Sequence, residues 1–363
     1  MSFRMRWTRP AGNQSIPFIP WSRPYQLEMP VFRESLASLG EYEPSHTLAI
    51  YMTLALFDTT SEHPFTEQEH PFRFEGFCKH AFWLLHQLRT FTDLEERRVP
   101  VYLIVTERSL DRFEPYRAAC DFPQSRVIVL PNLEYNLEWG HAYPQWHIKL
   151  EGFFTKTLMQ FERVLSVDAS LVVQPPQADA CRTPMFERIL QLWDAPERQH
   201  IALHQILFKA GESALTFQLS DHVPHVTLEE MLTRFAELIG SDVATETAFW
   251  QGGLIYDMQG SIYGMSRAFR EEKQELIRSL MRILPTDQMI ICGALREMDA
   301  TVEDVVEDIC AFGALTRKRL REAQESRFYY APSFGDVDSW QKESDNLLKL
   351  WRDIYQYEVD NAP

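Results

Sequence analysis

The stretch FERVLSVDASLVVQ, residues 161–174, decides the fold of this chain. Its apolar run over residues 164–167 stops at the carboxylate of Asp168, and a second apolar run begins at Leu171. Short apolar runs bounded by turn residues are typical of buried strands. A charged residue between two such runs marks the end of a strand, and open α/β sheets bind ligands beyond the carboxyl ends of their strands. We therefore predict a central strand over 164–167, with Asp168 at the carboxyl edge of the sheet.

Around this stretch, apolar segments alternate with segments of helical spacing. We expect strands over 47–57, 99–105 and 126–130, and helices over 75–94 and 109–120, the latter capped by Ser109. Strands that alternate with helices at this spacing predict a parallel sheet. The expected fold class is α/β, with a Rossmann-like, mixed, mostly parallel central sheet flanked by helices.

The segments nearest the predicted edge also have helical or strand patterns. Residues 149–160 are predicted to form an amphipathic helix with Lys149 and Lys156, seven residues apart, on one face. Further along the chain we expect a strand over 200–207 and a loop over 249–258 that enters a strand. Helices are expected over 185–193, 227–239 and 266–283, with another beginning at Thr286 and a helical region from 295 onward.

This order resembles the centre of nucleotide-sugar-dependent glycosyltransferases of the GT-A fold, in which a helix with a basic residue precedes a strand ending in Asp-x-Asp. Here the first Asp is Asp168, and Ser170 stands in the place of the second. The segment Trp250-Gln251-Gly252-Gly253 is similar to the one lining the sugar and acceptor site in that family. Asp287-Gln288 is similar to the Asp-Gln pair of glycogenin-like and related retaining galactosyl- or glucosyltransferases. The resemblance covers roughly residues 47–295.

The resemblance implies a role for each of these positions. Asp287 and Gln288 would be catalytic, with Asp287 nearest the reacting sugar as base or positioning group. Trp250, Gln251, Gly252 and Gly253 would contact the acceptor. Nucleotide-sugar contacts are expected at Thr53, Asp58, Lys149, Lys156, Asp168 and Ser170, and diphosphate contacts at Arg317, Lys318 and Arg319.

Each position also has a purely structural explanation. Asp168 would cap a turn, Thr53 would pack in the core, and Asp287 would favour the positive end of a helix dipole. The late basic run would be a solvated helix face. These alternatives stay open at the level of sequence.

A divalent metal is the expected cofactor of the family, and Asp168 would be its ligand here. Mn²⁺ and Mg²⁺ are hard cations that prefer carboxylate oxygens, whereas Ser170 supplies only a neutral hydroxyl. We therefore expect metal dependence to be weak or absent.

Composition narrows the class of protein. The net charge of −16 argues against a general nucleic-acid binder, which needs exposed lysine and arginine to neutralise phosphates. The five cysteines form no CxxC motif, which favours reduced thiols. The longest apolar run, residues 48–57, is shorter than the ~20 residues of a membrane span. With no apolar segment suited to a signal peptide, a cytoplasmic location is expected.

The domain prediction is an extended N-terminal arm over 1–45, a GT-A-like domain over 46–295 and a helical C-terminal region over 296–363 packed on the core. Within the central domain, 46–175 would bind the nucleotide and 176–295 the acceptor.

The expected function is transfer of a sugar, by a hexosyltransferase-like reaction, from a UDP- or GDP-sugar to a carbohydrate, protein or small-molecule hydroxyl. The Asp-Gln pair favours retention of configuration. One alternative is an inactive GT-A-like binding or assembly module, favoured by Ser170. The other is a viral or phage-type transferase acting on modified DNA bases, which the arginine-rich N-terminal arm allows.

Overall fold

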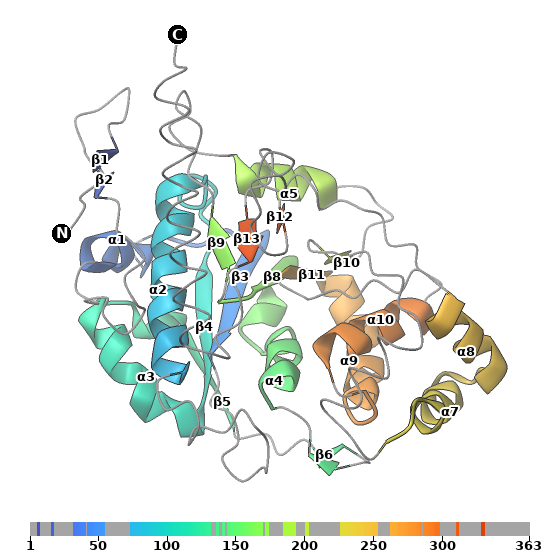
Figure 1. Cartoon of the computed structure of the whole chain (residues 1–363). Coiled ribbons are helices and arrows are strands. Elements are labelled where there is room, and N and C mark those ends of the chain that lie inside the picture. The colour runs from blue at the N-terminus through green and yellow to red at the C-terminus, as the bar shows by residue number, and fades with distance from the viewer. Residues whose placement is uncertain are drawn as a thin grey trace.

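The protein is seen in a computed structural model. The structure describes residues 6–7, 16–17, 32–40, 42–54, 73–131, 136–137, 140–141, 144–169, 171–173, 184–193, 200–202, 226–252, 262–284, 286–297, 310–311 and 328–330. Within these residues the fold is α/β, with a six-stranded central sheet flanked by helices (Figure 1), which confirms the predicted fold class.

The sheet has the strand order β10-β11-β8-β3-β4-β5. Strand β3 pairs in parallel with β4 and β8, and β4 pairs in parallel with β5, whereas β11 is antiparallel to both β8 and β10. The sheet is therefore mixed and mostly parallel. Its strands are β3 (Leu48–Leu54), β4 (Val101–Thr106), β5 (Val127–Leu130), β8 (Arg163–Val167), β10 (His200–Ala202) and β11 (Ile262–Ser266).

The chain reverses direction across the sheet between β3 and β8. From β3 it moves outward to β4 and β5, and then returns to place β8 on the other side of β3. This is the 3-2-1-4 order of doubly wound sheets, in which ligands bind beyond the carboxyl ends of the strands at the reversal. The register pairs Tyr51 with Ser166, so that two residues further on Thr53 and Asp168 stand level at this edge.

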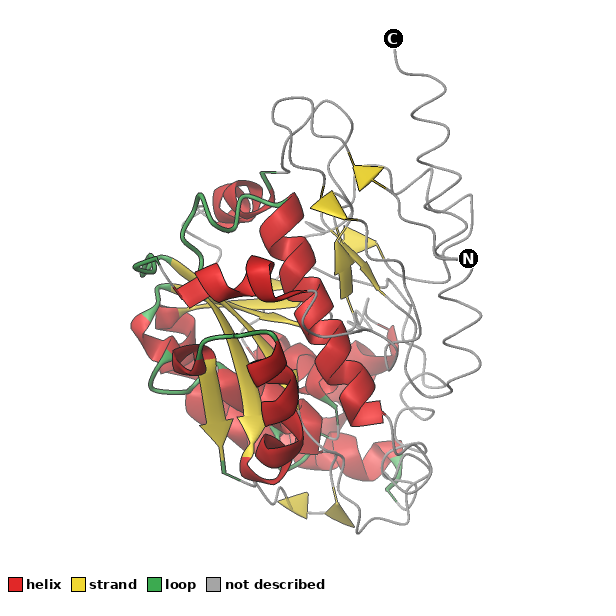
Figure 2. Ribbon diagram, turned by 90° about the vertical axis from the view of Figure 1, so that its left-hand side faces the viewer, coloured by secondary structure: helices red, strands yellow, loops and turns green. Residues whose placement is uncertain are grey.

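Helices cover both faces of the sheet (Figure 2). Alternate residues of β3 enter different cores: Leu48, Ile50, Met52 and Leu54 pack in a core with α2, α3 and α5, and Ala49 and Tyr51 in a core with α4 and α7 to α10. The helices are α1 (Arg33–Leu36), α2 (Arg73–Phe91), α3 (Glu107–Ala119), α4 (Pro144–Gly152), α5 (Met185–Trp193), α7 (Leu228–Ile239), α8 (Val243–Gly252), α9 (Arg267–Leu280) and α10 (Asp287–Glu297).

Several short elements complete the description. The small strands are β1 (Arg6–Trp7), β2 (Ile16–Pro17), β6 (Asn136–Leu137), β7 (Gly140–His141), β9 (Leu171–Val173), β12 (Cys310–Ala311) and β13 (Phe328–Tyr330). Strand β13 pairs with β9, which follows Asp168 along the chain. The 3-10 turns are η3 (Ala37–Gly40), η4 (Gln124–Arg126) and η5 (Leu158–Gln160).

Helix starts follow from local capping. Thr227 and Glu230 form a capping box at α7, and Gly240 ends that helix in the left-handed conformation at φ 70°. At α3 the cap is Thr106, whose backbone N–H donates to Ser109 Oγ at 2.9 Å. The prediction that Ser109 caps this helix is therefore wrong by three residues, because Ser109 is the far half of the box.

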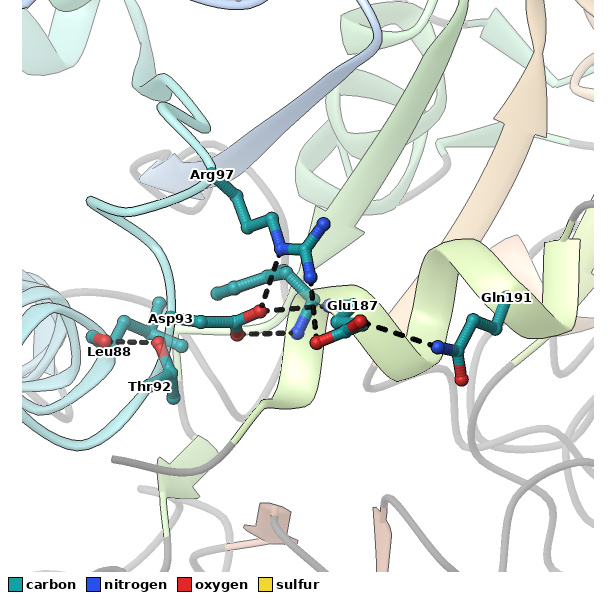
Figure 3. Close-up of polar contacts among 7 residues, drawn as sticks. Leu88, Thr92, Asp93, Arg97, Glu187 and Gln191 are labelled. Atoms are coloured by element: carbon teal, nitrogen blue, oxygen red, sulfur yellow. Dashed lines mark hydrogen bonds and ion pairs between the residues drawn. The ribbon is translucent and has the colours of Figure 1, made fainter. Parts of the chain in front are cut away.

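Helix α5 has a cap supplied by a different helix. Asp93, just beyond α2, accepts hydrogen bonds from the backbone N–H groups of Phe186 at 2.8 Å and Glu187 at 2.9 Å. Figure 3 shows Arg97 placed between this carboxylate and that of Glu187, at 3.4 and 2.7 Å. The long-range cap ties the end of α2 to the start of α5.

Four expectations about the elements need correction. The helix predicted over 149–160 ends at Gly152, and turns follow it. Residues 249–252 belong to α8 rather than to a loop. Residues 32–40 form short helical turns with Phe32, Leu36 and Leu39 buried, not an extended arm. Beyond residue 297 the structure describes residues 310–311 and 328–330, which form short strands, and the rest of the predicted helical region lies outside the described residues.

None of the described helices has the length and apolar composition needed to cross a membrane.

Candidate active site

Three charged side chains from three elements meet beyond the carboxyl ends of β3 and β8. Lys149 lies in the last turn of α4, Asp168 follows β8, and Asp287 is the first residue of α10. The Lys149 Nζ is 3.2 Å from Asp287 Oδ2 and 3.9 Å from Asp168 Oδ2. We call these residues, together with Tyr263, the Lys149 cluster.

Tyr263, on β11, packs its ring against the Lys149 ammonium group. Its ring centroid is 4.9 Å from Lys149 Nζ, a cation–π arrangement. Its hydroxyl interacts electrostatically with Asp287. Burial, with a further contribution from the Asp287 charge, holds the pKa of Tyr263 well above its usual value, so the hydroxyl keeps its proton.

Tyr51 on β3 fixes the end of α4. Its hydroxyl donates to the Lys149 carbonyl oxygen, and its ring packs edge-to-face on Phe153 with centroids 5.2 Å apart. Gly152 permits this approach, because a Cβ there would lie 2.5 Å from Tyr51 Cε2. The last turn of α4, and with it Lys149, is thereby held against the sheet.

Exposure differs sharply across the cluster. The side chain of Asp287 is 1% exposed, that of Lys149 11% and that of Asp168 32%. Level with Asp168, the Thr53 hydroxyl is buried and makes no hydrogen bond within the described part of the chain. A ligand at this edge would therefore meet Asp168 first, then the edge of Lys149, with Asp287 behind them.

The described residues do not fit a divalent metal ion. The ammonium group of Lys149 already lies between the two carboxylates. No group of three or more His, Cys, Asp or Glu side chains able to hold a metal occurs among the residues that the structure describes. Mn²⁺ and Mg²⁺ need about six oxygen ligands, far more than Asp168 supplies alone.

Lys156 does not join Lys149 on one helical face. Because α4 ends at Gly152, the spacing of seven residues no longer returns to the same side, and Lys156 is exposed in the following turn. The prediction that the two lysines share one helical face is therefore wrong.

Trp250 is a core residue in this structure, which argues against its predicted contact with the acceptor. The side chain is 0% exposed and packs edge-to-face on Phe235 and Phe249, with centroids 5.3 and 6.0 Å apart. Helix α8 turns the indole toward α7, so it offers no face to a sugar ring.

The remaining predicted site residues lie partly or wholly outside the described residues. Gly252 ends α8 and Gln288 lies in the first turn of α10, but the side chains of Gln251 and Gln288 lie outside the description. The positions outside the described residues are Asp58, Ser170, Gly253, Arg317, Lys318 and Arg319.

Sequence reasoning missed Tyr51 and Tyr263. Both are aromatic residues inside apolar strands, and in sequence they look like ordinary core positions. No local pattern indicates that the Tyr51 hydroxyl binds the Lys149 carbonyl oxygen or that the Tyr263 ring lies beside the Lys149 ammonium group.

Comparison with known proteins gives matches by structure. No protein-family model matches the chain, and no curated protein matches its sequence. The apo form of mouse xyloside xylosyltransferase 1 aligns with 80% of this chain and 99% of its own, at 11% identity and a TM-score of 0.43. The bifunctional glycosyltransferase WbbM aligns with 86% of this chain at 12% identity and a TM-score of 0.43, and the match covers 52% of WbbM. The galactosyltransferase LgtC aligns with 82% of this chain and 95% of its own, at 9% identity and a TM-score of 0.36. Scores this low assign no activity.

Proposed function

We propose that the protein is a glycosyltransferase that moves a sugar from a nucleotide-sugar donor to a hydroxyl acceptor. The observation that carries the proposal is the meeting of Lys149, Asp168 and Asp287 at the reversal of strand order between β3 and β8. This is the edge at which doubly wound sheets bind nucleotides.

The cluster suits a donor that combines anionic phosphate with sugar hydroxyls. Asp168 is the most exposed member and accepts hydrogen bonds from ribose or sugar hydroxyls. The Lys149 ammonium group offers a fixed positive charge toward the anionic donor. Asp287 lies behind Lys149 and restricts where that charge points.

In the proposed reaction the acceptor oxygen forms a bond to the anomeric carbon, and the bond from that carbon to the diphosphate oxygen breaks. The nucleoside diphosphate leaves with the electron pair, and the acceptor gives up its proton to the departing diphosphate oxygen. Asp287 is too buried and too closely paired with Lys149 to be the preferred base, so we assign it to orientation of Lys149. Retention of configuration is the proposed outcome, from the resemblance of Asp287-Gln288 alone.

The finer features of the proposal follow the sequence. A UDP- or GDP-sugar is the proposed donor, and a carbohydrate, protein or small molecule the acceptor. Ser170, Asp58 and the run Arg317-Lys318-Arg319 remain proposed contacts of the donor, and Gln288 remains a proposed catalytic residue. Metal dependence is proposed to be weak, since Lys149 rather than a second available carboxylate stands beside Asp168.

The second candidate is a GT-A-like module that binds without turnover. One observation favours it: among the described residues of the cluster, a single carboxylate, Asp168, has appreciable exposure. Action on DNA bases is less favoured, because the net charge is −16.

A binding and turnover screen separates these candidates. Purified protein is titrated with UDP- and GDP-sugars, with Mn²⁺ or with EDTA, and binding is followed by calorimetry. We expect one donor class to bind and to be hydrolysed or transferred, and Asp168→Asn to lose binding. Asp111→Asn, an exposed position on α3, is the matched control. Binding without turnover for any acceptor supports the module, and no binding at all rejects the proposed function.

A further inference from the structure

Arg270 on α9 is a buried cation whose role the cluster does not explain. Its side chain is 0% exposed, and it has no carboxylate partner within the part of the chain that the structure describes. Burial lowers the pKa of Arg270 to about 10, so it stays charged at neutral pH. A buried charge without an opposite charge beside it is destabilising, so other contacts must offset the loss of hydration.

Backbone carbonyls supply those contacts. The Nη1 of Arg270 donates to Phe153 O at 3.2 Å and Leu158 O at 2.9 Å, and Nη2 donates to Phe161 O at 2.6 Å. The Nε donates to Ser266 O, at the start of α9, at 3.2 Å. The planar fork of a guanidinium can reach several acceptors at once, which a lysine ammonium on a flexible stem cannot do with the same geometry.

The three carbonyls beyond α9 belong to a single connection. Phe153 follows the last residue of α4, Leu158 lies in the middle, and Phe161 comes just before β8. This connection of turns separates Lys149 at one end from Asp168 at the other. The guanidinium therefore bridges both ends of the segment that joins the two site residues.

We propose that Arg270 is a positioning residue for the transfer reaction: its fork fixes the connection 153–161 and thereby sets the placement of Lys149 relative to Asp168. The inference rests on the proposed function for its catalytic meaning. The effect of Arg270 on the position of Lys149 can be measured without any donor.

Arg267 provides a matched control on the same helix. Its Nη2 donates to Gln160 O at 3.2 Å and its Nε to Phe161 O at 3.4 Å, so it contacts only the β8 end of the connection. It is more exposed than Arg270 and reaches no carbonyl on the α4 side within the described residues. Loss of Arg267 should therefore leave Lys149 where it is.

The first measurement is chemical labelling of lysine in the full-length protein. Limited acetylation is read by mass spectrometry as the ratio of Lys149 to Lys156 modification, since Lys156 is exposed and lies in the same connection. We expect the ratio to rise several-fold in Arg270→Met and Arg270→Lys, and to stay at the wild-type value in Arg267→Met. Arg270→Lys keeps the charge and most of the volume, and serves if Arg270→Met folds poorly.

The second measurement is a double-mutant cycle on the donor found in the screen. Displacement of a catalytic group by about 1 Å can cost on the order of 10²-fold in rate, and we expect kcat/KM to fall by that order in Arg270→Lys. If Arg270 acts through Lys149, the same change has little further effect in a Lys149→Met background.

The outcomes are distinguishable. An unchanged labelling ratio in folded Arg270→Lys, with a lower melting temperature, would overturn the inference and leave Arg270 with a role in stability alone. A raised ratio in a protein that binds no nucleotide sugar would reject the proposed function but keep the placement of Lys149 by Arg270. A raised ratio with additive effects on kcat/KM would show that the displaced lysine does not govern the reaction, which also overturns the inference.

Discussion

At the scale of single residues, the pairing of Asp287 with Lys149 decides how the candidate site would work. Asp287 is 1% exposed and 3.2 Å from the ammonium group, which is the geometry of an orienting partner. A general base instead has to reach the acceptor hydroxyl. The two roles predict different behaviour in the same variant.

We expect Asp287→Asn to lower kcat/KM by about 10²-fold, because Lys149 loses the charge that directs it. The shape of the pH–rate profile should not change. A general base would instead lose the acidic limb of the profile and about 10²–10⁴-fold in rate. The comparison of the two profiles on the identified donor makes the distinction, with Asp111→Asn as control.

Removal of the cation should affect both stability and binding. Lys149→Met leaves the buried Asp287 without its ion pair, and breaking a buried pair in this way typically costs about 3–5 kcal/mol. We expect a clear fall in the free energy of unfolding by urea denaturation and loss of donor affinity. Lys156→Met, at the exposed neighbouring lysine, should change neither; an equal loss there would contradict the placement of Lys149 in the site.

At the scale of elements, the close contact between α4 and β3 is sensitive to a single methyl group. A Cβ on Gly152 would lie 2.5 Å from Tyr51 Cε2 and 2.7 Å from Ile104 Cδ1, so Gly152→Ala must push α4 away from the sheet. Overpacking of this kind costs about 1–3 kcal/mol, and we also expect weaker donor binding.

Gly240→Ala is the control for that prediction. Gly240 has φ 70° and nothing within 4 Å of an added Cβ, so alanine there suffers backbone strain of about 1–2 kcal/mol without displacing a neighbour. Both glycine variants should lose stability in urea, but donor affinity should fall in Gly152→Ala alone.

The cap that α2 supplies to α5 gives a second test at this scale. Asp93 accepts two backbone hydrogen bonds at the start of α5, and its side chain is 9% exposed. Hydrogen bonds to a charged group contribute about 1.5–3 kcal/mol, so Asp93→Ala should lower the free energy of unfolding by that order. Asp111→Ala on α3 should leave it within experimental error.

At the scale of the whole molecule, buried histidines make stability depend on pH. Burial lowers the pKa of His86 and of His147 to about 4, whereas the ordinary value is 6.5. Between these values the unfolded chain binds protons that the folded protein does not, so the free energy of unfolding falls as pH drops from 6.5 toward 4. Above pH 6.5 both states are neutral at these sites and the effect is absent.

Each of these histidines can contribute about 3 kcal/mol across that window. His147→Gln should therefore flatten the dependence of the unfolding free energy on pH between 6.5 and 4. A slope unaltered in His147→Gln would show that His147 is protonated in the folded protein.

Much of the fold was predictable because it depends on local pattern. The strand ending at Asp168, the helices α2, α5, α7 and α9, and the parallel arrangement of β3, β4, β5 and β8 all follow from periodicity and from residues such as Thr227 and Ser266. The spacing of apolar residues along the chain predicts these elements, because side chains return to the same face at a fixed period in helices and in strands. The end of α4 at Gly152 and the helical character of residues 249–252 were not predictable, since tertiary contacts outweigh propensity at element ends.

The sequence by itself determined the α/β class, the carboxylate at the edge of the central strand, and three charged residues, Lys149, Asp168 and Asp287, as candidates for one site. The tertiary structure alone decided that Lys149 lies between the two carboxylates, that Trp250 is buried, that Tyr51 and Tyr263 contact Lys149, and that Arg270 binds the connection 153–161. The reason is physical: burial and pairing depend on which distant segments pack together, and Arg270 contacts carbonyls more than a hundred residues away, with no local pattern to mark it.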